Sequence, residues 1–388
     1  MKEVYLDNSA TTKVCPEAAE KVIEMLTLKY GNPSSLHTKG IEAEKEINLA
    51  RQIIADYLGC DISEIYFTSG GTEANNLAIL GAIKALKRRG NKIITTSIEH
   101  PSVIEAFKEA ERLGLETVFI EPDQNGLVNE EKVCNAIDSN TILVSMMLVN
   151  NEVGTIQNVS NIKRVASIRK SQAFVHIDAV QAFGKIPFKV QKIGADLLTI
   201  SSHKIHGPKG IGALFVSKKA RILPIMFGGG QEKAIRPGTE SSMLIAGFGS
   251  AVEALPNIKD EYRYISELNL YLREKLNYLN GVIINSPAEA LPYIINFSVN
   301  GIRSETMLHH LSSLNIYVSS GSACSKGKKS HVLSSMGLND DIIDSSIRVS
   351  FSRYNDKADV DALVDGLKLG IKNLAKRGRK WKKLYLLK

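Results

Sequence analysis

A lysine and an aspartate at the ends of two apolar runs could together hold a reactive aldehyde cofactor. Asp178 ends one run, and Lys204 follows the next, 26 residues further along the chain. Pyridoxal phosphate needs such a pair, because a lysine forms the Schiff base with its aldehyde and an acid keeps its pyridine nitrogen protonated. Both residue types are common on protein surfaces. The pair alone therefore does not identify a cofactor site.

A glycine turn between a predicted strand and a predicted helix is a candidate phosphate site. Residues 68–73 read Thr-Ser-Gly-Gly-Thr-Glu, with Gly71 and Thr72 at the expected start of the helix. Free backbone N–H groups and the positive helix end favour an anion there. An ordinary capped helix start gives the same pattern, so both interpretations stay open. The GxxxxGK[ST] pattern of a nucleotide P-loop is missing.

Three further polar residues suit a flat cofactor and a carboxylate substrate. His100 ends a predicted strand, where its ring could lie over a planar ligand, and Asn151 also follows a strand. Arg348 lies on an alternating strand, and its planar fork suits an α-carboxylate. Each of them alone would more simply be a capping or surface residue.

Cys324 is the candidate nucleophile. It lies in a loop of small and basic residues, 319–330, where neighbouring lysines favour the thiolate. The other cysteines, Cys15, Cys60 and Cys134, lie beside helical or turn patterns and are interpreted as structural. None of the four forms a Cys-x-x-Cys pair, so neither a zinc site nor a redox dithiol is predicted.

The elements that must position these residues follow an α/β pattern. Helical stretches separate seven apolar runs, which predict a mostly parallel, seven-stranded sheet covered by helices, with strands at 65–68, 93–96, 117–120, 142–147, 174–177, 197–200 and 213–216. Ligands of such sheets bind at the carboxyl ends of the strands. Upstream, a helix over 40–58 is expected to bury Ile41, Ile47, Ile53, Ile54 and Leu58.

A chain of 388 residues exceeds one small core. We expect a large domain over residues 15–258 and a smaller α+β domain formed by 1–14 and 259–375, which carries the loop 319–330. The final helix is expected near 357–375, before a basic tail at 376–388.

Composition predicts a globular protein, with 44% hydrophobic and 23% charged residues and no apolar run of membrane-spanning length. The start of the chain lacks a signal-peptide core, so a cytoplasmic location is expected. The net charge is +8, but seven positive charges lie in residues 376–388 and the remainder is nearly neutral. That tail could contact RNA or an acidic partner, or it could be a solvated helix end.

From residue 5 to the strand around Arg348, the chain resembles the pyridoxal-phosphate cysteine desulfurases of the NifS and IscS group, within the class V aminotransferase family and its fold type I architecture. The residues that carry the resemblance are specific: Tyr-Leu-Asp-Asn-Ser-Ala-Thr-Thr at 5–12, Gly-Asn-Pro-Ser-Ser at 31–35, the turn at 70–73, Glu99 with His100, residues 150–154, His203 with Lys204, and 320–324.

The resemblance implies a role for each matching residue. Lys204 would form the Schiff base, Asp178 would bind the pyridine nitrogen, Gln181 the phenolic oxygen, and His100 would stack on the ring. The phosphate ligands would be Gly71, Thr72, Ser201 and His203, with Thr239 reaching the phosphate from the other subunit of a homodimer. Asn151 and Arg348 would bind the carboxylate of the substrate.

The implied reaction converts L-cysteine to L-alanine, with Cys324 taking the sulfur as a persulfide. The acceptor would be an iron–sulfur scaffold or a tRNA thiolation enzyme, and the lysine-rich segment after Cys324, shorter than in the IscS type, leaves that choice open. The alternatives are a selenocysteine lyase or another class V activity, such as a transaminase, and an RNA-binding or scaffolding protein with a vestigial cofactor fold. A transaminase would not need Cys324, and a vestigial fold would be expected to have lost Lys204 or Asp178.

Overall fold

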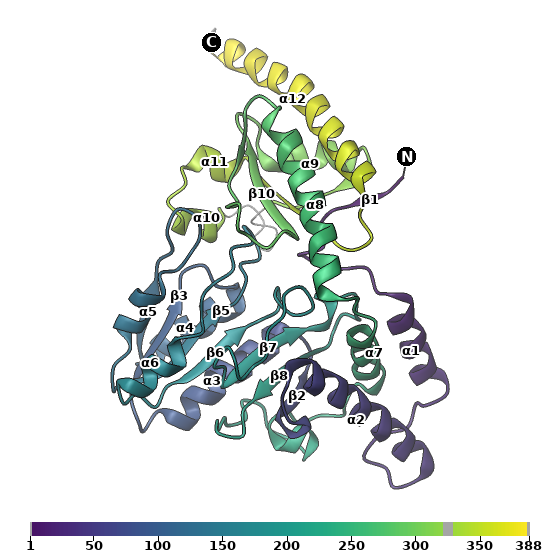
Figure 1. Ribbon diagram of the computed structural model, residues 1–388, viewed down its shortest axis with the longest axis vertical. Helices are drawn as coiled ribbons and strands as arrows, with labels where there is room; N and C mark the ends of the chain where they lie inside the picture. The colour runs from purple at the N-terminus through teal and green to yellow at the C-terminus, as the bar shows by residue number, and fades with distance from the viewer. Residues whose placement is uncertain (1, 321–328, 386–388) are drawn as a thin grey trace.

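The computed structural model describes residues 2–320 and 329–385, with side chains to residue 374. Its larger sheet has seven strands in the order β2-β8-β7-β6-β5-β3-β4 (Figure 1). The strands are β2 (Ile65–Thr68), β3 (Lys92–Thr96), β4 (Glu116–Ile120), β5 (Thr141–Met147), β6 (Phe174–Asp178), β7 (Leu197–Ser201) and β8 (Gly212–Val216). Six of these strands run in the same direction, and β8 runs opposite to them. The predicted fold class and its seven-stranded, mostly parallel sheet are confirmed.

Helices cover both faces of this sheet, because alternate residues of each strand point to opposite sides. Ile93, Leu143 and Leu197 pack in one cluster with α3 (Gly71–Leu86) and α4 (Pro101–Arg112). Their neighbours Ile94, Val144 and Leu198 belong to the second cluster, with α2 (Thr38–Leu58) and α7 (Ser242–Glu253). The remaining helices of this part are α1 (Pro16–Thr27), α5 (Glu130–Ala136) and α6 (Ile162–Ile168).

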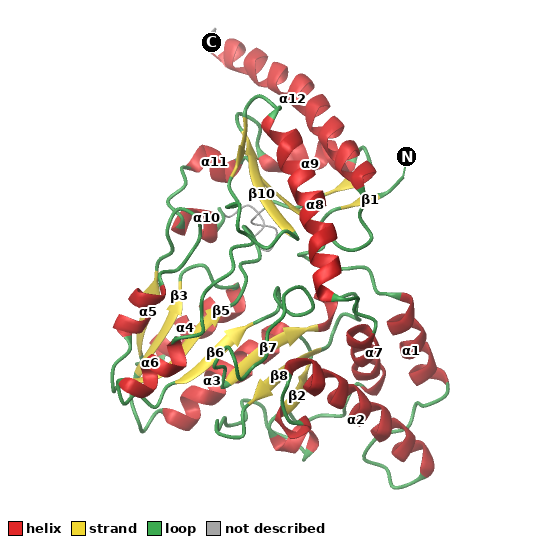
Figure 2. Cartoon of the chain, in the orientation of Figure 1, coloured by secondary structure: helices red, strands yellow, loops and turns green. Residues whose placement is uncertain are grey.

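The N-terminal strand joins the C-terminal elements in a second group (Figure 2). β1 (Val4–Tyr5) pairs in parallel with β11 (Ile316–Tyr317). An antiparallel sheet has the order β12-β10-β9, from β9 (Val282–Ile284), β10 (Ile294–Val299) and β12 (Ser346–Ser350). The helices of this group are α8 (Ile258–Asn277), α9 (Ser304–Ser312), α10 (His331–Ser335), α11 (Asp340–Asp344) and α12 (Lys357–Tyr385). The exact domain boundaries stay a prediction.

Helix α12 continues beyond the predicted end at residue 375, as far as Tyr385. Lysine, arginine and leucine, which make up most of this extension, are good helix formers. Within the described residues, no helix has both the length and the apolar character that crossing a bilayer requires.

A left-handed turn in the short helix η3 (Gln231–Ala234) is held by a buried ion pair. Glu232, Lys233 and Ala234 have φ angles of 46°, 55° and 58°, which non-glycine residues seldom adopt. The Glu232 carboxylate accepts hydrogen bonds from both terminal nitrogens of Arg51, at 2.8 and 2.5 Å, and from the Phe67 backbone N–H at 2.9 Å. These contacts bind the turn to α2 and to β2.

We expect Glu232→Ala to lower the free energy of unfolding by about 3–5 kcal/mol, because it leaves a largely buried guanidinium without its carboxylate. Lys218→Ala is the matched control, since the Lys218–Asp61 pair has a similar separation of 2.8 Å but is exposed, with side-chain accessibilities of 61% and 46%. It should cause little measurable change. Urea unfolding of both variants checks this, and equal losses would contradict the assignment of the Arg51–Glu232 pair as the anchor of the turn.

Candidate active site

A cavity of about 450 Å³ opens at the carboxyl ends of the central strands. Met147, Asp178 and Ser201, the last residues of β5, β6 and β7, line it. The start of α3, the N-terminal segment at Ser9 and Arg348 of β12 complete the wall. The size suits a small organic ligand rather than a single ion or water.

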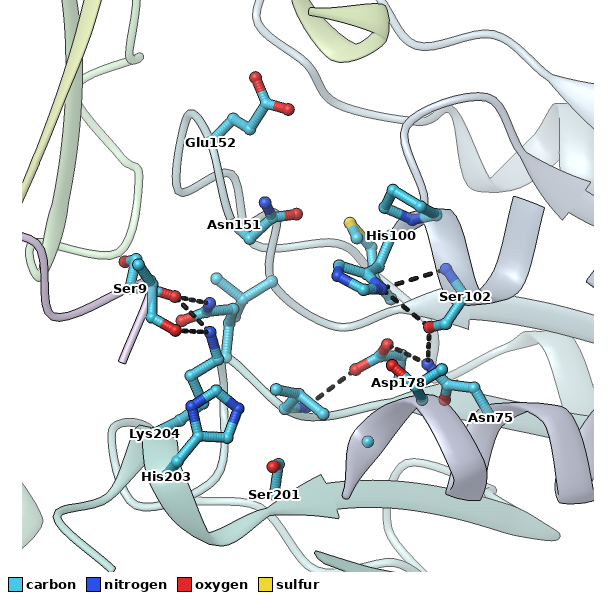
Figure 3. Close-up of a pocket in the computed structure, with 18 of the residues that line it drawn as sticks. Ser9, Asn75, His100, Ser102, Asn151, Glu152, Asp178, Ser201, His203 and Lys204 are labelled. Atoms are coloured by element: carbon cyan, nitrogen blue, oxygen red, sulfur yellow. Dashed lines mark hydrogen bonds between the residues drawn. The ribbon is translucent and has the colours of Figure 1, made fainter. Parts of the chain in front are cut away.

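Asp178 is fixed at the floor of this cavity, and only 5% of its surface is exposed. Its Oδ2 atom accepts a hydrogen bond from Asn75 Nδ2 at 2.8 Å, and its Oδ1 atom accepts one from the Val180 backbone N–H at 2.9 Å (Figure 3). Asn75 also donates to Ser102 Oγ at 2.9 Å, which fixes the direction of its amide. A carboxylate held in this way favours a cationic group placed against it.

Lys204 approaches the same cavity from the short helix η2 (Ser202–Lys204), which follows β7. Its Nζ donates to the carbonyl oxygens of Ser9 and, at 2.8 Å, of Ala10. The Thr12 backbone N–H donates to the carbonyl oxygen of His203 at 3.0 Å. The N-terminal segment therefore holds the lysine through main-chain contacts.

His100 caps the start of α4 and extends its ring into the cavity, near Asp178 in the view of Figure 3. Its Nδ1 accepts a hydrogen bond from the Ser102 backbone N–H at 3.2 Å and lies 2.8 Å from Ser102 Oγ. Burial lowers the pKa of His100, and the charges of Lys204 and His331 add to this against the opposing effect of Asp178. A neutral, oriented ring results, which can stack on a planar ligand.

The side of the cavity near α3 carries polar groups that are available to an anion. Gly71 and Thr72 lie in the first turn of α3, where backbone N–H groups have no partner within the helix. A Cβ atom at Gly71 would come within 3.1 Å of Val180, so glycine keeps this wall open. Ser201 Oγ is buried and has no hydrogen-bond partner among the described residues. Buried hydroxyls normally have one, so a ligand oxygen fits here.

His203 lines the same side, with Nδ1 3.2 Å from Thr11 Oγ1. Burial, followed by the nearby charges of Lys204 and Lys209, lowers the pKa of His203 to about 3. The ring is therefore neutral at physiological pH and can offer an N–H group to an anion.

Arg348 enters the cavity from β12 and is only 4% exposed. Its Nη1 donates to the carbonyl oxygen of Asn151 at 3.0 Å, and its Nη2 donates to Asp7 Oδ1 at 2.9 Å. The Nε atom is buried without a partner among the described residues. The guanidinium is thus already oriented, and Asn151 itself lines the cavity beside it.

Two predicted site residues do not belong to the described wall. Thr239 is exposed and does not line the cavity. Cys324 lies in residues 321–328, outside the described part of the chain. The other predicted residues all line this one cavity, namely Gly71, Thr72, His100, Asn151, Asp178, Gln181, Ser201, His203, Lys204 and Arg348.

Several cavity residues were missed by sequence reasoning. Asn75 follows Gly71 by four positions, and this helical spacing was the available signal for a shared face. Glu152 lines the cavity and accepts a hydrogen bond from Ser330 Oγ at 2.5 Å, while burial raises its pKa to about 7. His331 Nε2 lies 2.9 Å from the carbonyl oxygen of Glu99. No local pattern pairs Glu152 or Glu99 with residues so distant in sequence.

Comparison with known proteins assigns the chain to a family. The model of the aminotransferase class-V family matches residues 4–363. A cysteine desulfurase IscS of Methanosarcina thermophila is 41% identical over 368 residues, covering 94% of this chain and 91% of that protein.

Two solved structures have the same fold at substantial identity. A NifS-like protein superposes with a TM-score of 0.90 at 36% identity, covering 96% of this chain and 100% of that one. SspA in complex with cysteine superposes with a TM-score of 0.80 at 34% identity, covering 92% and 100%. The chain therefore belongs to the aminotransferase class-V family and, within it, to the cysteine desulfurases.

Proposed function

We propose that this cysteine desulfurase holds pyridoxal 5′-phosphate in the cavity between Asp178 and Lys204 and converts L-cysteine to L-alanine, with the sulfur passing to Cys324. The observation that carries the proposal is the meeting of a buried carboxylate and a lysine amine at one cavity, beside a buried serine hydroxyl that has no hydrogen-bond partner among the described residues. The relative solved with cysteine supports this substrate.

The residues of the cavity fit each part of the cofactor. Asp178 would face the pyridine nitrogen, Lys204 the aldehyde, and the His100 ring would lie against the pyridine ring. Gln181 would donate to the phenolic oxygen. The phosphate would bind to the start of α3, at Gly71 and Thr72, and to the side chains of Ser201 and His203. When bound, pyridoxal phosphate supplies an electron sink for the negative charge that develops at the substrate Cα.

The chain's own residues then bind the substrate and move its protons. Arg348 and Asn151 bind the α-carboxylate, and the Arg348 Nε donor, which has no partner in the described part of the chain, supports this role. Lys204 Nζ takes the proton from Cα, a transfer favoured by its position at the cavity wall. Burial of the Arg348 site keeps water from competing for the carboxylate.

Cys324 is the proposed sulfur acceptor. Its thiolate attacks the substrate sulfur, so that an S–S bond forms while the Cβ–S bond breaks. Cβ keeps the electron pair and takes a proton, and Lys204 returns a proton to Cα, which yields alanine and a persulfide on Cys324. Burial raises the thiol pKa of all three described cysteines, Cys15, Cys60 (to about 12) and Cys134, which makes them poor nucleophiles.

We further propose a homodimer with shared sites and delivery of sulfur to an iron–sulfur scaffold or a tRNA thiolation enzyme. Thr239 supports the homodimer, because it is exposed and does not line the cavity of its own chain. Arg236, on the same loop, donates to Glu73 Oε1 of α3 at 2.7 Å, which keeps the loop beside the start of that helix. The resemblance to the NifS and IscS group supports the proposal that sulfur is delivered to one of these acceptors. Direct RNA binding by the basic tail stays a hypothesis.

Cys324→Ala should abolish alanine formation from L-cysteine in the presence of a thiol reductant, because no other described thiol is ionised and near the cavity. Binding of pyridoxal phosphate, followed by its visible absorbance, should be unchanged. Cys134→Ala, which removes a buried thiol elsewhere, is the matched control and should keep full activity. Equal alanine formation by both variants would show that Cys324 does not take the sulfur and would favour a lyase or transaminase.

Arg348→Lys should raise KM for L-cysteine by about tenfold or more, since an ammonium cannot replace a planar fork that holds Asp7, Asn151 and a carboxylate together. Arg273→Lys is the control, because Arg273 makes hydrogen bonds to Asn269, Ser286 and Pro287 away from the cavity. Steady-state kinetics of both variants measure this KM, and an unchanged KM in Arg348→Lys would show that Arg348 does not bind the substrate carboxylate.

A further inference from the structure

A second lysine, Lys185, is buried behind the cavity and does not line it. Only 7% of its surface is exposed, and its Nζ donates to Gln181 Oε1 at 3.0 Å. Gly184 precedes it with a φ of 77°, and a Cβ there would come within 2.8 Å of Ile205. Glycine therefore permits the turn that directs Lys185 inward.

Burying an ammonium is costly unless its hydrogen bonds are made. Nζ also lies 5.9 Å from the centre of the Tyr293 ring. A second, much smaller cavity of about 20 Å³ is lined by Lys185, Lys204, Glu261, Tyr293 and other residues, and it has room for one water. Burial lowers the pKa of Lys185 to about 8, and the charge of Glu261 acts in the opposite direction. Lys185 therefore keeps a proton to donate at pH 7.

The hydrogen bond between Lys185 Nζ and Gln181 Oε1 determines the orientation of the Gln181 amide. An ammonium only donates, so the amide oxygen must face Lys185. The Gln181 Nε2 group then faces the carbonyl oxygen of Ser9, to which it donates at 3.0 Å. The same carbonyl accepts from Lys204 Nζ. One chain of hydrogen bonds thus runs from Lys185 through Gln181 and Ser9 to Lys204.

We propose that Lys185 is a positioning residue that sets the orientation of the Gln181 amide, so that Gln181 presents N–H groups rather than its oxygen to the cavity. Without Lys185 the Gln181 amide could rotate and turn its oxygen toward the Ser9 carbonyl oxygen or a ligand oxygen. The amide oxygen would repel either of these atoms. This inference rests on the proposed function, because the ligand oxygen that benefits is the phenolic oxygen of pyridoxal phosphate.

The test is a double-mutant cycle on cofactor affinity, measured by titrating the apoprotein with pyridoxal phosphate and following visible absorbance. Lys185→Met keeps the length of the side chain without the donor and should weaken binding about 5- to 10-fold, the effect of one hydrogen bond. In a Gln181→Ala background the same substitution should have little further effect, because Lys185 acts through Gln181. Lys189→Met is the control, since Lys189 is exposed and donates to the backbone carbonyls of Asp56 and Tyr57, away from Gln181.

A second variant keeps the proposal testable if Lys185→Met does not fold. Lys185→Arg retains a group that only donates and should bind pyridoxal phosphate within about twofold of the unmodified protein. Unchanged affinity in Lys185→Met, effects that multiply in the cycle, or a loss in Lys185→Arg as large as that in Lys185→Met would each overturn the positioning role. If the unmodified protein develops no visible absorbance at all, the proposed function fails, and the role of Lys185 fails with it.

Discussion

Strands β5, β6 and β7 run parallel, so their carboxyl ends meet at one edge of the sheet, and the cavity depends on this arrangement. Asp178 ends β6 and Ser201 ends β7, while Lys204 follows directly on η2. Reversing one of these strands would send its last residue to the opposite edge. The buried carboxylate and the lysine are therefore brought together by strand direction, and loops only adjust their final positions.

The two ends of the chain complete what the sheet begins. The N-terminal segment supplies the carbonyl oxygens of Ser9 and Ala10 to Lys204, and Asp7 binds Arg348 from β12. Asp7 also forms a bridge with Ser350 on that strand. Because one wall belongs to the large sheet and the other to the terminal segments, the packing of the two groups of elements sets the width of the cavity. This arrangement accounts for buried polar side chains that neither group could satisfy alone.

Much of the fold could be predicted from the sequence, because strand and helix periods differ and glycine turns separate them. The period of a helix shows which residues share a face but not how wide the buried stripe is, and Ile41, predicted to be buried, is 43% exposed. Asp178 and Lys204 could be predicted for the site because one ends a strand and the other follows one closely. Lys185 could not, because lysine is rarely buried and only the tertiary structure supplies its partner. Thr239, which no local pattern places either, does not line the cavity of its own chain.

The central claim is that the lysine opposite Asp178 is the one that reacts with the cofactor. Incubation of the full chain with pyridoxal phosphate, reduction with borohydride and mass spectrometry of the peptides tests it most directly, because reduction makes the bond to the reacting lysine permanent. We predict a single modified residue, Lys204, with modification lost in Lys204→Ala. Modification of Lys185 or Lys209 instead, or of no lysine, would contradict the account of this site.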